Sequence, residues 1–397
     1  MNLNEYLKYT CTQIRSPRLL EVDSMKSMFL TLSSYILDFD ACQHISLHEV
    51  YSSEVYPRYV RLDDKDYIIW DNHFWDLYGH FLLMHFSYDN LKVPIAKDSY
   101  IDYYKSLLLL FLSSRFEKVP SLSRYIAEEY KNLSIKISRY DKVEDINSIL
   151  AEKGYLEHLN LGRAFGYCHE IAHVAFRRQN QLSFTVKNKI IDYCEQWMFL
   201  QKLNKPEDNN SDLKIAFSIS KQLIEDKDGR LLEEICCDVI AMYAMVTYFE
   251  IQGLNKVEIS NKIATIDYFL LFIWWLSSNN QFWNMMRMIY LNPVANDNAF
   301  VDEKNPFYNY GNKITEELSV RSNFTFNFLA EFSKIPIQKK RVINRLINEG
   351  FYDLLQLSNG YDVMQKILIK YSASRKDYNS GVKHLHKKNR LVGWIIE

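Results

Sequence analysis

Glycine and proline are scarce in this chain, whose 397 residues include 11 Gly and 8 Pro. Glycine thus makes up about 3% of the residues, against ~7% in an average protein. None of the patterns G-x-G-x-x-G, G-x-x-x-x-G-K-[ST] or G-x-S-x-G occurs, so no motif indicates a dinucleotide-binding, P-loop or serine-hydrolase site. The shortage of turn-forming residues favours long helices with short connections over an all-β architecture.

Paired cysteines and long apolar runs are also lacking. The six cysteines form no C-x-x-C pair, which argues against a disulfide scaffold or a thiolate zinc cluster and favours the reduced thiols of a cytosolic protein. The N-terminus lacks the cationic and apolar segments of a signal peptide. The longest uninterrupted apolar run, 268–276, has nine residues, against the ~20 that a membrane-spanning helix needs. We therefore predict a cytoplasmic protein with no membrane span.

The charges nearly balance, with 48 Lys+Arg against 49 Asp+Glu and a net charge of −1. The whole chain therefore lacks the basic footprint of a nucleic-acid-binding protein. The C-terminal segment 335–397 is locally basic, a feature that a solvated helical surface explains as simply as an anionic partner does.

The chain is rich in core-forming residues, with 48% hydrophobic and 15% aromatic side chains. Two short β-rich runs, 58–62 and 67–70, flank a polar turn and predict a hairpin. Asp71 or Asn72 is placed to cap a helix through His85. Helical periodicity continues at 100–115, 120–134, 156–179, 213–225 and 230–251, followed by a very apolar segment at 257–278 and three more helical segments to about 372.

We therefore predict a mainly α protein with a small β-sheet or hairpin, that is, an α+β fold. The organisation has three parts. Residues 1–150 form an N-terminal region with the hairpin and helices, 151–290 a helical core, and 291–397 a C-terminal helical region that is locally basic.

One motif carries chemistry. Residues 168–173 read Cys-His-Glu-Ile-Ala-His, an H-E-x-x-H pattern inside the helix predicted over 156–179. Positions i and i+4 share one face of a helix, so both imidazoles of His169 and His173 can reach one Zn²⁺. Glu170 is offset by one residue, so its carboxylate lies beside the metal and accepts a proton from zinc-bound water. A solvated helix face carrying two histidines and a glutamate is the simpler alternative.

A catalytic zinc needs three protein ligands and an open position for water. The best third donor lies 61 residues after His173, in Leu-Leu-Glu-Glu-Ile-Cys-Cys-Asp at 231–238. Glu234 and Asp238 stand at i and i+4 of a second predicted helix. We predict that Glu234 ligates the metal and that Asp238 accepts the free ring N–H of a ligating histidine, which fixes its tautomer. Acidic residues inside such an apolar stretch need a partner if they are buried.

The two motifs and their spacing resemble the gluzincin branch of the zincin metallopeptidases. The resemblance implies His169, His173 and Glu234 as zinc ligands, with Glu233 as the alternative third ligand. It implies Glu170 as general base and Asp238 as the orienting acid. It further implies a zincin-like core with extra helical segments, and a sheet whose edge strand holds an extended peptide, for which the hairpin at 58–70 is the candidate.

Two features depart from known zincins. The glycine and third histidine of metzincins do not follow His173, which excludes that branch. No residue matches the group with which gluzincins stabilise the tetrahedral intermediate; Arg321, Tyr308 and Tyr310 are candidates by position alone.

Other histidines and cysteines give weaker signals. Cys168 at i−1 points away from the histidine pair, which favours a small buried side chain over a nucleophile. His73, His80 and His85 have spacings of seven and five, which do not form a standard metal pair.

The sequence thus predicts a zinc-dependent metallopeptidase that hydrolyses peptide bonds of a protein or peptide substrate. A narrow intracellular target, as for a toxin, a regulatory protease or a phage-exclusion protease, suits the cytosolic character and the large extra sequence. The alternative is a zincin-like protein-interaction scaffold without catalysis.

Overall fold

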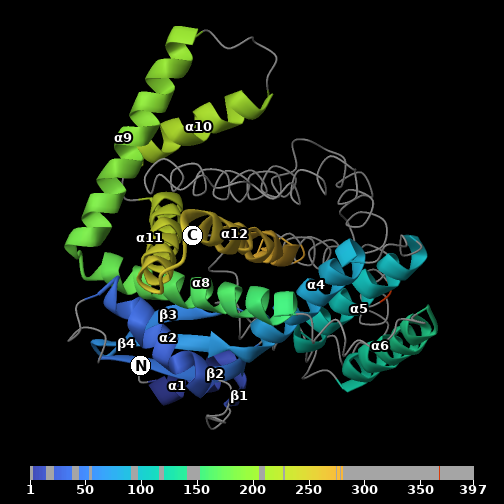
Figure 1. The fold of residues 1–397 in the computed structure, drawn as a ribbon. Coiled ribbons are helices and arrows are strands. Elements are labelled where there is room, and N and C mark those ends of the chain that lie inside the picture. The colour runs from blue at the N-terminus through green and yellow to red at the C-terminus, as the bar shows by residue number, and fades with distance from the viewer. Residues whose placement is uncertain are drawn as a thin grey trace, which may run out of the picture.

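The computed structural model describes residues 3–14, 22–37, 44–52, 56–90, 97–115, 120–140, 153–204, 211–226, 229–273, 275–277, 279 and 366. This part of the chain is mostly helical and contains one small mixed sheet (Figure 1). The predicted mainly α fold with a small sheet is confirmed. The predicted domain boundaries near 150 and 290 fall outside the described residues.

The helices agree closely with the periodicity of the sequence. Predicted helices at 100–115, 120–134, 156–179, 213–225 and 230–251 correspond to α5, α6, α8, α10 and α11. Helices α1, α2 and α9 were not predicted. The bounds are α1 (Leu3–Thr10), α2 (Val22–Ser34), α4 (Asn72–Asn90), α5 (Lys97–Arg115), α6 (Pro120–Tyr140), α8 (Lys153–Arg177), α9 (Gln181–Asn204), α10 (Ser211–Glu225), α11 (Arg230–Ile251) and α12 (Lys256–Ala264).

The sheet has the strand order β1-β2-β4-β3, with β1 (Cys11–Ile14), β2 (Ile45–Ser52), β3 (Arg58–Leu62) and β4 (Lys65–Asp71). Strands β3 and β4 form the predicted hairpin. Its turn residues Asp63 and Asp64 both have positive φ, 49° and 60°, as a two-residue type I′ turn requires. Strand β2 pairs parallel to β4, and neither β1 nor β2 was predicted. Strand β3 lies at an edge of the sheet.

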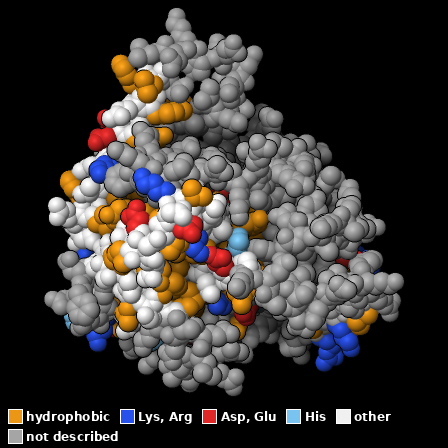
Figure 2. Space-filling model, viewed as in Figure 1, with side chains coloured by type: hydrophobic (Ala, Val, Ile, Leu, Met, Phe, Trp, Pro, Cys, Tyr) orange, Lys and Arg blue, Asp and Glu red, His pale blue; other side chains and the backbone are white. Residues whose placement is uncertain are grey.

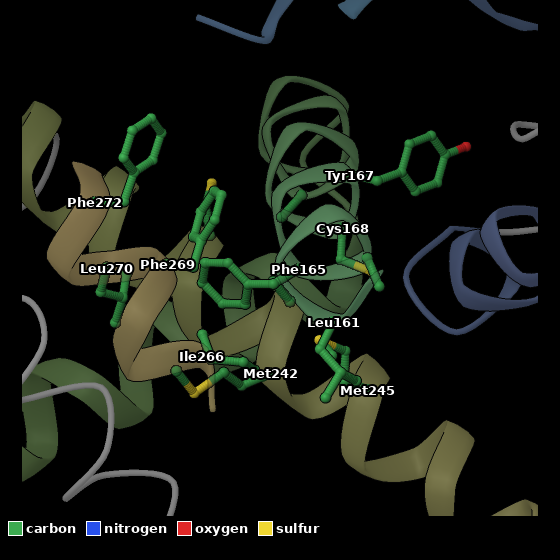
Figure 3. Close-up of a cluster of buried hydrophobic side chains, with 14 of the residues drawn as sticks. Leu161, Phe165, Tyr167, Cys168, Met242, Met245, Ile266, Phe269, Leu270 and Phe272 are labelled. Atoms are coloured by element: carbon green, nitrogen blue, oxygen red, sulfur yellow. The ribbon is translucent and has the colours of Figure 1, made fainter. Parts of the chain in front are cut away.

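Helix α8 has a central position in the fold, with the sheet on one side and α11 on the other (Figure 1). It also packs against α2, α4 and α9. Aromatic and sulfur-containing side chains fill the space between α8, α11 and the segment after α12 (Figure 3). The cluster includes Leu161, Phe165, Met242, Met245, Ile266 and Phe269.

Two glycines allow α4 to approach α8 closely. A Cβ on Gly166 would lie 2.7 Å from the Trp75 ring, and one on Gly162 would lie 2.5 Å from the Tyr78 ring. These glycines are one turn apart and sit on the face of α8 that receives α4. The buried aromatic side chains of α4 therefore rest directly on the α8 backbone, which holds the helix that carries the H-E-x-x-H motif.

A buried polar contact ties the C-terminal end of α8 to the hairpin. Arg178, just after the helix, donates from Nη2 to Asp66 Oδ2 at 2.6 Å and from Nε to the same oxygen at 3.1 Å. The hydroxyl of Tyr59 donates to the other oxygen, Asp66 Oδ1, at 2.7 Å. The hairpin and α8 thus have a fixed relative position near the motif. Among the described residues, no helix combines the length and apolar character that crossing a bilayer requires.

Candidate metal centre

The candidate metal centre lies where α8 packs against α11 (Figure 1). Helix α8 supplies His169 and His173, one turn apart on one face. Helix α11 supplies Glu234 from its first turns. The structure brings these three side chains together, with one donor atom from each within 4.8 Å of the others. This group of the described residues could hold a metal ion.

The three side chains point their donor atoms at a common space. The Nε2 atoms of His169 and His173 are 3.2 Å apart. Glu234 places Oε2 3.4 Å from the first of these nitrogens and Oε1 3.8 Å from the second. The two imidazole planes are inclined by 82°, so the rings meet at their Nε2 corners instead of stacking.

Each imidazole has a carboxylate at its other nitrogen. Asp238 Oδ1 lies 2.9 Å from His169 Nδ1, and Glu233 Oε1 lies 2.9 Å from His173 Nδ1. The Glu233 contact is a hydrogen bond, and the Asp238 contact is a close approach without hydrogen-bond geometry. A negative carboxylate beside Nδ1 favours a proton on that nitrogen in both cases. Each Nε2 atom then has a lone pair directed toward the space between the three side chains.

This donor set fits a cation. With protons on both Nδ1 atoms, two nitrogen lone pairs and the carboxylate of Glu234 converge, which is unfavourable unless a positive charge lies among them. Imidazole nitrogen and carboxylate oxygen are standard ligands of zinc. Two ligands at ~2.05 Å from a tetrahedral ion are about 3.3 Å apart. The two Nε2 atoms are 3.2 Å apart, and each has one Glu234 oxygen nearby: Oε2 at 3.4 Å from His169 and Oε1 at 3.8 Å from His173.

The predicted general base, Glu170, is buried beside this group. Its Oε2 accepts a hydrogen bond from the backbone N–H of Tyr59 at 2.6 Å. Burial raises the pKa of the Glu170 carboxyl, while the nearby imidazoles and the Tyr59 N–H oppose the rise. The edge strand β3 therefore holds one carboxylate oxygen of Glu170 in place.

The sequence did not predict the position of Glu233. It was an alternative third ligand, but its carboxylate lies at Nδ1 of His173, away from the shared space at Nε2. The hydrogen bond with His173 lowers the pKa of Glu233. Glu233 thus orients His173 as Asp238 orients His169. Two adjacent acidic residues were visible in the sequence, but nothing in it indicated which would face which nitrogen.

The neighbouring thiols are buried and not arranged for chemistry. Cys168, Cys194, Cys236 and Cys237 are all free and buried. Burial raises the pKa of Cys168 and Cys237, which disfavours the thiolate that a nucleophile or metal ligand needs. Cys237 Sγ lies 3.5 Å from Nδ1 of His173, behind the imidazole and not at Nε2.

The remaining sequence candidates do not join the centre. Arg321, Tyr308 and Tyr310 fall outside the described residues, as does nearly all of the basic C-terminal segment, and the side chain of His85 is likewise not described. His73 and His80 lie on α4 and take no part in the metal-binding group.

No protein-family model, curated protein sequence or solved structure matches this chain. The geometry of the centre therefore carries the functional argument.

Proposed function

We propose that this chain is a zinc-dependent metallopeptidase, with His169, His173 and Glu234 holding the ion. The observation that carries the proposal is the convergence of acceptors: two imidazoles, each with a carboxylate at Nδ1, turn Nε2 toward a third carboxylate. Zinc has the matching ligand preference and supplies Lewis acidity, which makes water more acidic and a carbonyl carbon more electrophilic.

Each residue around the centre has a separate role in the proposed hydrolysis. Glu170 Oε1 accepts a proton from the attacking water while Tyr59 N–H holds Oε2. The protonated Glu170 then gives that proton to the leaving amine nitrogen as the C–N bond breaks. Asp238 and Glu233 keep both imidazoles in the ligating tautomer throughout. Water is consumed, and the products are a carboxylate and an amine.

The proposed substrate is a peptide bond in an intracellular protein. Four free buried thiols among the described residues support a reducing compartment. The small catalytic region within a 397-residue chain supports a protease of narrow target, of the toxin, regulatory or phage-exclusion type.

The first experiment separates metal binding from catalysis. Glu170→Gln removes the proton acceptor but no proposed ligand, so this variant should bind one zinc per chain and lose cleavage. His169→Ala should lose both. Glu157→Gln makes the same chemical change on the other glutamate of α8, which pairs with Lys262 at the surface, and should keep both properties.

Substrates are sought by comparing the proteomes of cells that express the wild type and Glu170→Gln. A new protein terminus present only with the wild type supports the peptidase. Turnover retained in Glu170→Gln contradicts the role of this residue. Bound zinc without any cleavage product in either strain overturns the peptidase and favours the non-catalytic scaffold.

A further inference from the structure

Arg177 lies close to the candidate centre and has no role in the proposal so far. It is four residues after His173 and seven after Glu170 on α8, so all three project from one face of the helix. The helical rise places its backbone ~6 Å along the axis from His173. Its side chain is exposed and therefore available to a ligand that approaches the centre.

The surroundings place Arg177 between the two walls of the centre. Two α8 residues on the same face as Arg177 contact these walls: Glu170 accepts a hydrogen bond from Tyr59 N–H of β3, and His173 is hydrogen-bonded to Glu233 of α11. Burial raises the pKa of Tyr59 and the charge of Arg177 opposes that rise. Arg177 thus extends the face of α8 that meets both the edge strand and the helix of the third ligand.

Three other arginines, on the hairpin, at the end of α8 and on α11, have acidic partners. Arg178 is bound to Asp66, and Arg61 contacts Asp64 at 3.3 Å. Arg230 Nε lies 3.9 Å from Glu234 Oε1. In contrast, no acidic residue of the described part of the chain forms an ion pair with Arg177. Figure 2 shows basic and acidic side chains close together on one face of the molecule.

A substrate with a negative charge near its reacting bond needs such a cation. Glu170, Glu233, Glu234 and Asp238 give the centre four carboxylates against two charges on a divalent ion. These acids would repel an acidic peptide, unless a positive side chain offsets them on the side from which it approaches. The planar guanidinium group binds a carboxylate through two parallel hydrogen bonds.

We propose that Arg177 binds a carboxylate of the substrate close to the scissile bond, so that the centre prefers acidic substrates. The carboxylate belongs either to an Asp or Glu side chain or to the C-terminus of the peptide. With ~3.3 Å per residue in an extended chain, the ~6 Å offset corresponds to about two residues from the scissile bond. This inference rests on the proposed function, because it assigns the substrate class of the same centre.

The first test measures binding and does not depend on turnover. The probes are hydroxamates with a terminal carboxylate two to four methylenes from the metal-binding group, each paired with its methyl ester. Zinc-loaded wild type should bind the best carboxylate probe about five- to tenfold more tightly than its ester, the scale of a partly exposed charge-assisted contact. Titration calorimetry at two salt concentrations gives both affinities, and the preference should weaken at higher salt.

Variants assign the preference to Arg177. Arg177→Gln should bind acid and ester equally, and Arg177→Lys should keep part of the preference. The control Lys221→Gln removes an exposed positive charge from α10 and should behave like the wild type. Equal binding of acid and ester by the wild type overturns the inference, as does a preference that survives in Arg177→Gln.

A peptide library distinguishes the two sources of the carboxylate. Its members carry Asp, Glu, Asn or Gln at each position, with a free or amidated C-terminus. A preference for Asp and Glu that Arg177→Gln abolishes indicates a side-chain carboxylate; loss of cleavage on amidation indicates the chain terminus. Cleavage with neither preference overturns the inference but leaves the peptidase intact. Acid-selective hydroxamate binding with no cleaved peptide overturns the peptidase alone, and a chain that binds neither zinc nor hydroxamate overturns both.

Discussion

The contacts behind the imidazoles predict an order of zinc affinities among three isosteric variants. Asp238 and Glu233 both lie 2.9 Å from an Nδ1 atom, but the Asp238 side chain is 0% exposed whereas that of Glu233 is 32% exposed. Loss of a carboxylate that orients a ligating histidine costs roughly 10–100-fold in metal affinity. Water can replace part of an exposed contact but not a buried one.

We therefore expect Glu233→Gln to weaken zinc binding about tenfold and Asp238→Asn about 100-fold, or about 1.4 and 2.7 kcal/mol. Glu234→Gln removes a ligand and should weaken binding by more than about 100-fold. Competition with a chromophoric chelator at neutral pH measures all three, and urea unfolding of the metal-free proteins controls for loss of the fold. The reasoning is refuted if Glu234→Gln binds zinc like the wild type, or if Glu233→Gln is weaker than Asp238→Asn.

Three further outcomes follow from contacts outside the ligand set. Gly166→Ala should destabilise the protein by about 1–3 kcal/mol in urea unfolding, because the new Cβ would meet the buried Trp75 ring at 2.7 Å; a gain in stability, as helix propensity alone predicts, would contradict this packing. Asp66→Asn should lower the free energy of unfolding by about 1–3 kcal/mol in the same assay, because it weakens the contacts with both Arg178 and Tyr59. Asp64→Asn at the exposed turn serves as the control. The buried thiols should react with a disulfide reagent only after unfolding. Burial also raises the pKa of Cys194 to about 12, so the unfolded chain loses thiol protons first and stability should fall as pH rises above 9; constant stability between pH 8 and 10 would refute the burial of these groups.

Local patterns predicted much of the fold because they depend on neighbours in the sequence. The hairpin of β3 and β4 follows from two β-rich runs around a polar turn, and α8 and α11 follow from apolar periodicity. Strand β2 alternates apolar and polar residues only over 45–48, and its partner β4 is parallel, so no tight turn marked the pair. Helix α9 exposes Phe184, Phe199 and Leu200, and its apolar residues therefore give no single stripe.

Only part of the candidate site was predictable from local patterns in the sequence. Helix geometry alone places His169 and His173 on one face. The choice between Glu233 and Glu234 depends on how α11 is rotated against α8, because adjacent residues of a helix point about 100° apart. That rotation is set by packing between segments distant in sequence, and periodicity does not determine it. The same reasoning explains why Arg177 gave no signal: its neighbours come from β3 and α11.

Because two helices share the centre, its assembly depends on how α8 and α11 are aligned along each other. Helix α8 contributes only imidazoles to the ligand set, and α11 contributes only acids. Nonpolar side chains such as Phe165, Met242 and Met245 fill the space beside these ligands, and nonpolar contact has no directional requirement. A slip of one residue turns Glu234 away by about 100° and shifts it by about 1.5 Å. A misaligned chain would not bring the three donors together, so uptake of the ion would discriminate the correct alignment of the two helices from its near neighbours.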